Sequence, residues 1–259
     1  MGKIKEGMHL AYGGISIVNA VPCGNGAVMP IDLKVYAREG KSSKDSSLTI
    51  AIKDYIRKKY NILTDFYIES EIPEGMGLKS SSAVSVAAIS SIANKIGNPY
   101  PPYLSAKISK EYGLSITGAF DDAVASYTGM ISFTNNYSFN IVKLEKNAEE
   151  LKAIILIKES RHPINLDSMR KRCNKFNSAY KMALEGRIYD AMILNGKLMA
   201  EINGYSLEII DNALKKGALS AGISGNGPSY FALTKNGEEG SIIDLFSTYG
   251  KLIVVDVLH

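Results

Sequence analysis

The residues from Ile72 to Ala83 combine glycines and serine hydroxyls directly before an apolar stretch that predicts a helix. Glycine lets the backbone turn tightly and come close to a ligand. The unpaired N–H groups at a helix start favour bound phosphate, and serine hydroxyls can bind phosphate or magnesium. The segment therefore predicts a phosphate-binding loop. Its candidate residues are Pro73, Glu74, Gly75, Met76, Gly77, Leu78, Lys79, Ser80, Ser81, Ser82 and Ala83.

The same segment is also typical of an ordinary loop with a helix cap, and it departs from the common nucleotide-binding templates. In a P-loop the lysine directly follows a glycine, whereas here Leu78 precedes Lys79. A dinucleotide fingerprint requires a third glycine where Ser80 stands. The protein-kinase motifs His-Arg-Asp and Asp-Phe-Gly are absent from the sequence. A phosphate loop at this position therefore belongs to another class.

A second glycine-rich loop runs from Ala221 to Ser229, between two predicted strands. A tight β-turn would account for one or two of its glycines. The three glycines at Gly222, Gly225 and Gly227 permit backbone conformations that are closed to other residues. The pattern therefore favours a loop that approaches another part of a site.

Two adjacent carboxylates, Asp121 and Asp122, are embedded in apolar and small residues. One interpretation is helix capping, because an aspartate in the first turn stabilises a helix by about 1 kcal/mol. The other is that one carboxylate accepts or orients a substrate hydroxyl proton during phosphoryl transfer. The second carboxylate would then help to hold magnesium or a cationic side chain. Both residues are candidate catalytic groups.

Composition limits the classes of protein to which the chain can belong. Its 259 residues suffice for one large domain or two closely packed lobes, and 46% hydrophobic with 22% charged residues is an ordinary soluble composition. The net charge of +4 without a long basic stripe argues against nucleic-acid binding. The apolar runs are too short for a membrane span, and the N-terminus lacks a signal-peptide core. Cys23 and Cys173 have no metal-site spacing and predict no disulfide framework, so we expect a reduced, cytoplasmic setting.

The elements that must position these residues alternate between strands and helices, and returning strands indicate an α+β fold rather than a doubly wound sheet. Strands are predicted within residues 8–37 and at 66–68, 130–134, 138–143, 153–158, 220–224, 229–234 and 252–257. Helices are predicted at residues 46–59, 80–96, 101–113, 122–129, 166–184, 188–202, 207–215 and 239–246. A change in character near residues 145–152 predicts two lobes, residues 1–148 and 149–259.

Taken together, the Gly/Ser loop, the aspartate stretch and the second glycine loop resemble the motifs of the GHMP small-molecule kinase superfamily, in the same order. Within it, the details look most like the archaeal-type shikimate kinases. The matching segments are residues 18–20, 24–26, 31–33, 77–83, 117–123, 183–187, 194–196 and 222–229. The departures are Pro22-Cys23, Met29-Pro30 and Lys79, which replaces a frequent Gly or Ser.

This resemblance implies a two-lobed fold, with an N-terminal lobe similar to ribosomal S5 domain 2 and a ferredoxin-like C-terminal lobe. It also implies ATP-dependent phosphorylation of the 3-hydroxyl of shikimate, a step of chorismate and aromatic amino-acid biosynthesis. ATP and Mg²⁺ would be the cofactors, with the loop residues named above as the ATP site. Ser80 or Ser81 would be the magnesium ligand, and Asp122, or failing that Asp121, the base. Counting from Gly118 favours Asp121, whereas counting back from Gly129 favours Asp122.

A shikimate site needs partners for hydroxyls and a cation for the carboxylate. The resemblance supplies most of the candidate substrate-binding residues, and Arg161 is the candidate cation, with Arg170 and Arg187 as alternatives. The candidate substrate-binding residues are Asn19, Asp32, Arg161, Gly222, Ser224, Gly225 and Gly227.

Two other functions remain open at the level of sequence. Another GHMP kinase, such as a homoserine or mevalonate-pathway kinase, would share the phosphate site and differ in its acceptor. A non-catalytic, S5-like binding module would share only the fold. The sequence sets no oligomeric state.

Overall fold

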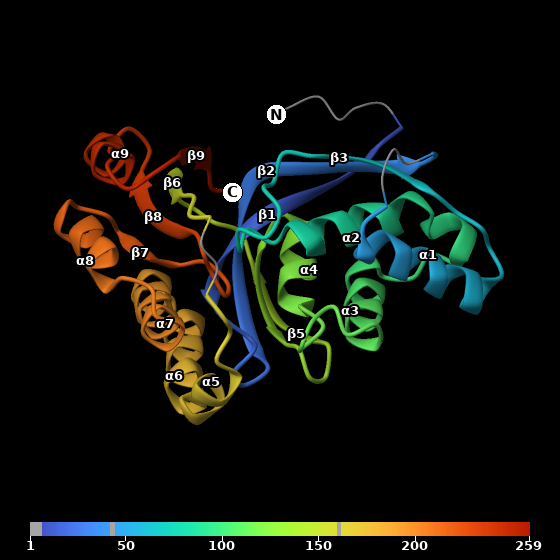
Figure 1. The fold of residues 1–259 in the computed structure, drawn as a ribbon, viewed down its shortest axis with the longest axis horizontal. Helices are drawn as coiled ribbons and strands as arrows, with labels where there is room; N and C mark the ends of the chain where they lie inside the picture. Colours follow the sequence, from blue (N-terminus) through green and yellow to red (C-terminus); the bar gives the residue numbers. More distant parts are fainter. Residues whose placement is uncertain (1–6, 42–44, 160–161) are drawn as a thin grey trace.

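Two antiparallel sheets organise the computed structural model, which describes residues 7–41, 45–159 and 162–259 (Figure 1). The first sheet has the order β1-β2-β4-β5, with β3 also paired to β2. Because β2 is 15 residues long, one edge pairs with β1 while the other pairs with β4 at its start and β3 at its end. The strands are β1 (His9–Val18), β2 (Asn25–Glu39), β3 (Phe66–Ser70), β4 (Ile131–Asn135) and β5 (Asn140–Glu145).

Helices from the first half of the chain cover one side of this sheet (Figure 1). Helix α2 packs against β1, β2 and α4, and small buried residues such as Ala83 and Ala87 allow this close approach. The helices are α1 (Ser47–Tyr60), α2 (Ser80–Ser91), the 3₁₀ helix η1 (Ala93–Ile96), α3 (Pro101–Glu111) and α4 (Phe120–Thr128).

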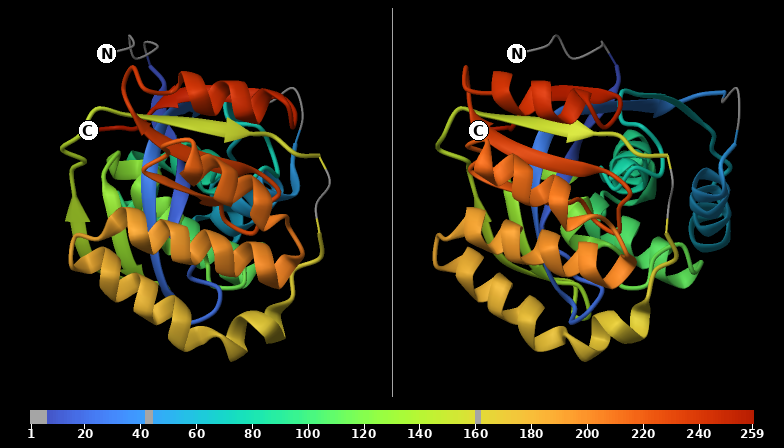
Figure 2. Two further views of the ribbon diagram at one scale, coloured as in Figure 1. Left: turned by 90° about the vertical axis from the view of Figure 1, so that its left-hand side faces the viewer. Right: turned by 60° about the vertical axis from the view of Figure 1, so that its left-hand side comes forward.

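The second sheet has the order β7-β8-β6-β9, and α6 and α7 run side by side next to it (Figure 2). Gly196 of α7 and Gly222 of β7 touch, and a Cβ on either would clash with the backbone of the other. This contact explains why both positions are glycine. The elements are β6 (Leu151–Leu156), α5 (Leu166–Lys171), α6 (Cys173–Leu184), α7 (Ile188–Asn203), α8 (Leu207–Lys215), β7 (Ser220–Ile223), β8 (Tyr230–Lys235), α9 (Gly240–Ser247) and β9 (Leu252–Asp256).

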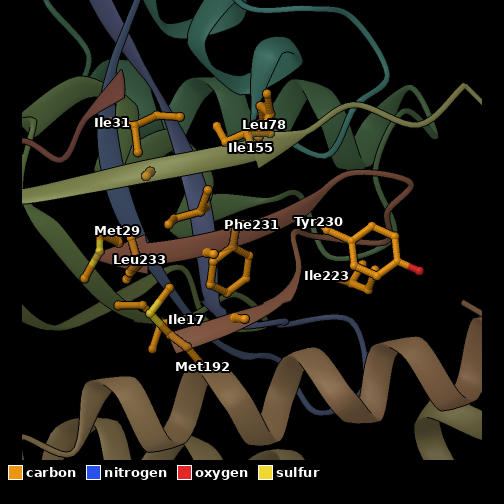
Figure 3. Packing of buried hydrophobic residues seen from close by; sticks show 14 of the residues in the cluster. Ile17, Met29, Ile31, Leu78, Ile155, Met192, Ile223, Tyr230, Phe231 and Leu233 are labelled. Carbon is orange, nitrogen blue, oxygen red and sulfur yellow. The ribbon is translucent and has the colours of Figure 1, made fainter. Parts of the chain in front are cut away.

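One hydrophobic cluster joins the two sheets (Figure 3). It includes Ile17 of β1, Ile155 of β6, Met192 of α7 and Phe231 of β8, and it also takes in Leu78 of the first glycine loop. The loop is thereby anchored to residues of both halves of the chain. Strands β1–β5 and β6–β9 form separate sheets, but the division into lobes at residues 148 and 149 stays a prediction.

The α+β class and the order of elements predicted from the sequence are confirmed. The helix predicted over residues 166–184 is divided into α5 and α6 at Arg172. Two further differences concern the helix that begins at residue 80 and the two cysteines. The helix predicted over residues 80–96 ends at Ser91, and the chain then tightens into η1 before Gly97, which has a φ of +81°. The second difference is that Cys23 and Cys173 form a disulfide, with their Cα atoms 5.4 Å apart. The expectation that the two cysteines are unpaired is wrong, because the fold brings the β1–β2 turn against the start of α6. Among the described residues, no helix combines the length and the apolar character that a membrane span requires.

Candidate active site

The Gly/Ser loop forms one wall of a cavity of about 350 Å³. Gly75 and Gly77 have φ values of +73° and +76°, which explains why the loop needs glycine there. Leu78 is 1% exposed and holds the loop to the core. The loop residues that line the cavity are Gly75, Met76, Gly77, Leu78, Lys79, Ser80, Ser81 and Ser82.

The start of α2 faces this cavity with its first turn uncapped. Lys79 occupies the N-cap position, and its side chain accepts no capping hydrogen bond from the N–H groups in the first turn of the helix. Ser80 and Ser82 are mostly buried, whereas Ser81 is exposed. These donors and hydroxyls suit a bound phosphate group. Pro73, Glu74 and Ala83, at the ends of the predicted segment, do not line the cavity.

The second glycine loop also lines the cavity, with Gly225, Asn226 and Gly227. The Ser224 hydroxyl donates a hydrogen bond to the carbonyl oxygen of Gly77 at 2.8 Å, so the two loops are bonded to each other. Gly222 does not line the cavity. Its contact with α7 makes it a packing residue in this structure.

The two aspartates lie in the first turn of α4 but face different surroundings. Asp122 lines the cavity, and its Oδ1 lies 2.9 Å from the Nζ of Lys79. Asp121 is 4% exposed and does not line the cavity. Its Oδ1 accepts a hydrogen bond of 2.7 Å from the side-chain amide of Asn136.

Burial and, next in effect, the neighbouring Asp122 carboxylate raise the pKa of Asp121 from 3.8 to about 7. Lys79 and the Asn136 amide act in the opposite direction and lower it. The native protein therefore holds this proton more tightly than the unfolded chain, so Asp121 lowers stability as the pH rises from about 4 to about 7.

We expect Asp121→Asn to become more stable relative to the wild-type protein as the pH rises through this window. Between pH 4 and pH 8, the free energy of unfolding of Asp121→Asn should rise relative to that of the wild-type protein by on the order of 2–4 kcal/mol, because each pKa unit corresponds to about 1.4 kcal/mol. Urea unfolding of both proteins at several pH values measures it. A difference that stays constant over this range would show that Asp121 titrates as it does in the unfolded chain.

The candidate substrate residues are only partly brought together. Asn19 is 6% exposed, and its side-chain amide donates to the Oδ1 of Asn226 at 2.9 Å, which links it to the cavity. Asp32 lies in a separate cavity beside residues 128–130 at the far end of α4, where it pairs with Lys34. The structure therefore does not bring Asp32 to Asp122, because β2 places it elsewhere.

Of the candidate cations for a substrate carboxylate, the two that the structure describes, Arg170 and Arg187, do not line the cavity. Arg161 lies outside the described residues. Arg170 lines another cavity beside α5, and Arg187 is exposed and pairs with Glu185 at 3.1 Å. Among the described residues that line the cavity, Lys79 alone carries a positive charge.

The resemblance to the archaeal-type shikimate kinases also supplies Ser16 as a possible partner for a substrate hydroxyl. In the structure, the Oγ of Ser16 in β1 accepts hydrogen bonds from the Nζ of Lys79 at 2.7 Å and the backbone N–H of Gly225 at 3.1 Å. Asn226 also lines the cavity, and the only sequence feature that points to it is its position between Gly225 and Gly227 in the second glycine loop. Other lining residues belong to no recognisable motif. They lie at the start of α1, near the end of α3 and in the turn after α3: Ser47, Leu48, Ser109, Leu114 and Ser115.

Comparisons with known proteins agree with this arrangement. The family model "GHMP kinases N terminal domain" matches residues 47–130, and "GHMP kinases C terminal" matches residues 186–244. A shikimate kinase of Methanosarcina mazei is 34% identical over 89% of this chain and 86% of its own length. A shikimate kinase of Archaeoglobus fulgidus is 30% identical over 94% of this chain and 90% of its own length.

The fold has similar solved structures. The mevalonate kinase of Methanococcus jannaschii superposes with a TM-score of 0.73 at 14% identity, and the match covers 100% of this chain and 99% of that one. Likeness at this identity concerns the fold alone, whereas the curated relatives match in sequence along most of the chain. The chain therefore belongs to the GHMP kinase superfamily, within its family of archaeal-type shikimate kinases.

Proposed function

We propose that this kinase transfers the γ-phosphoryl group of ATP to the 3-hydroxyl of shikimate, as a cytoplasmic step of chorismate biosynthesis. The observation that carries the proposal is the position of the Asp122 carboxylate in the same cavity as the uncapped start of α2. Phosphoryl transfer needs alignment and charge neutralisation more than covalent chemistry from the protein. A phosphate-binding site that faces a carboxylate can align the two reactants, and its N–H groups can neutralise charge on the phosphate.

The triphosphate binds along the loop from Gly75 to Lys79 and the first-turn N–H groups of Ser80 to Ser82. The nucleoside extends toward the helix ends around Ser47, Ser109 and Ser115, which line the same cavity. This places the γ-phosphoryl group in the part of the cavity that the two glycine loops and Asp122 line.

Magnesium fits the residues present, although the described residues contain no cluster of three acidic, histidine or cysteine side chains. Mg²⁺ in kinases typically uses one or two protein oxygens together with phosphate oxygens and water. The hydroxyl of Ser80 or Ser81, which lines the cavity, would supply such a protein oxygen. When bound, the ion neutralises charge on the phosphate oxygens.

In the reaction, the acceptor hydroxyl oxygen forms a bond to the γ-phosphorus, and the bond between that phosphorus and the β–γ bridging oxygen breaks. ADP leaves with the electron pair. The hydroxyl proton passes to the Asp122 carboxylate and from there to solvent. The Asp122 side chain lines the cavity and is 17% exposed, so its carboxylate is accessible to a substrate hydroxyl.

On the acceptor side, Asn19 and Asn226 provide amide groups for substrate hydroxyls, and the loop from Ser224 to Gly227 limits the space available. The cation that binds the shikimate carboxylate is assigned to Arg161, which follows β6 in the segment that leads to α5. The two shikimate kinases named above support shikimate as the acceptor.

The experiment is an acceptor panel in a coupled assay for ADP release. With Mg-ATP, we expect shikimate to give turnover and a product with the mass of shikimate 3-phosphate, while homoserine and mevalonate give background rates. Turnover of homoserine or mevalonate instead of shikimate would assign a different GHMP kinase activity. ATP binding without turnover of any acceptor would contradict the proposed enzyme.

A further inference from the structure

We propose that Lys79 is a positioning residue for Asp122 rather than a ligand of the triphosphate, an inference that rests on the proposed kinase function. In this assignment its ammonium group holds the carboxylate of Asp122 in place and balances its charge before the acceptor binds. The basis is where the fold puts the Lys79 side chain, although its backbone lies in the phosphate loop.

The backbone of Lys79 has an unusual conformation for a lysine. Its φ and ψ are 67° and 21°, in the left-handed region that glycine adopts without cost and other residues rarely occupy. Residues held in such conformations concentrate at functional sites. Glycine would satisfy the backbone here at a lower cost, so the contacts of the lysine side chain are the feature that sets this position apart.

The ammonium group of Lys79 is committed to the catalytic side of the cavity. It lies 2.9 Å from the Oδ1 of Asp122 and donates to the Ser16 hydroxyl oxygen at 2.7 Å. The Lys79 side chain is 8% exposed and that of Asp122 is 17% exposed, so solvent screens this pair poorly.

Ser16 fixes the lysine to the second glycine loop. Its Oγ also accepts the backbone N–H of Gly225 at 3.1 Å, so β1, the phosphate loop and the second glycine loop meet at one point. A lysine that served the triphosphate would need this charge free in the cavity. Here the charge neutralises Asp122 and its orientation is set by Ser16.

The two roles make different kinetic predictions. A triphosphate ligand contributes to ATP binding, so its loss should weaken nucleotide affinity. A residue that positions Asp122 acts when the acceptor hydroxyl attacks, so its loss should lower kcat. For Lys79→Met we expect kcat to fall about 10²–10³-fold, while the Kd for Mg-ADP and the KM for ATP change less than about 5-fold.

Lys79→Gln serves as the second variant, because it retains a hydrogen-bond donor for Ser16 without the charge. Lys34→Met is the matched control. Lys34 also forms a poorly exposed ion pair, 2.6 Å from Asp32 and with 16% of its side chain exposed, but it lies in the cavity at the other end of α4. Its kcat should stay within about twofold of the wild-type value.

A double-mutant cycle with Asp122→Asn tests whether the two residues act as a unit. We expect the double variant to be about as slow as Asp122→Asn alone, because groups that act together lose their effects non-additively. Multiplicative losses, or a Kd for Mg-ADP weakened as much as kcat/KM with kcat unchanged, would overturn the inference.

These kinetic measurements distinguish failure of the proposed kinase function from failure of the inference about Lys79. Failure of the proposed function appears as absence of shikimate turnover by the wild-type protein. Failure of the Lys79 inference appears in the ratio of variant to wild-type rates, taken with whichever acceptor the wild-type protein phosphorylates. Thermal unfolding of each variant confirms that the compared proteins are folded.

Discussion

Asp122→Asn should lose turnover by about 10²–10⁴-fold, the range typical of general-base catalysis, while it still binds Mg-ATP within about threefold of the wild-type affinity. An amide cannot accept the proton of the acceptor hydroxyl, but it nearly preserves the size and shape of the carboxylate. The phosphate loop and the start of α2 are unchanged by the substitution. Steady-state kinetics with the acceptor and calorimetric titration with a nucleotide measure the two quantities.

Asp121→Asn is the matched control, because the adjacent residue undergoes the same chemical change. Its side chain is 4% exposed and bonds to Asn136 instead of lining the cavity. We expect its turnover to fall less than about tenfold. If Asp121→Asn were inactive and Asp122→Asn active, the assignment of the base would shift by one residue. Full activity of both would remove the base from the mechanism.

Gly77→Ala should lower both stability and turnover, because Gly77 lies where the two glycine loops contact each other. Gly77 has a φ of +76°, and an added Cβ would overlap the carbonyl oxygen of Ser224, which is backbone and cannot rotate away. Separation of the loops would also break the bond from the Ser224 hydroxyl to Gly77. We expect a loss of about 3 kcal/mol in the free energy of unfolding and a fall of about 10²-fold in kcat.

Gly75→Ala separates the steric effect from backbone strain. Gly75 has nearly the same φ, +73°, but an added Cβ would meet no atom within 4 Å. The expected cost is therefore only that of a left-handed alanine, about 1 kcal/mol. Urea unfolding of both variants gives the comparison. Equal destabilisation would mean that contact with Ser224 does not determine the requirement for glycine at position 77.

The order of strands and helices could be read from the sequence because it depends on local patterns. Helix α1 begins after Ser46 and ends with Asn61 in a left-handed conformation, as helical spacing and cap chemistry predict. The disulfide between Cys23 and Cys173 had no such signal, since its cysteines are 150 residues apart. Long-range contacts of this kind depend on packing that no local pattern encodes.

The candidate site divides in the same way. Glycines with positive φ and a serine-rich helix start are local requirements, so the two loops were recognisable as site segments before any contact was known. Which aspartate faces the cavity is decided by a rotation of about 100° between successive helix residues, and that follows only from how α4 packs. Tertiary packing also decides the position of Asp32. It belongs to a segment that resembles the archaeal-type shikimate kinases, but β2 places it at the opposite end of α4 from Asp122.

The sequence by itself determined which functional segments the protein has: a glycine-serine phosphate loop, a pair of carboxylates and a second glycine loop, in the order typical of one kinase superfamily. The tertiary structure decided which atoms meet. In the folded protein Asp122 faces the cavity and Asp121 is buried, and the Lys79 ammonium group contacts Asp122 and Ser16. The physical reason is that residue types and backbone preferences are local properties, whereas the pairing of buried charges depends on segments that only the packed core brings together.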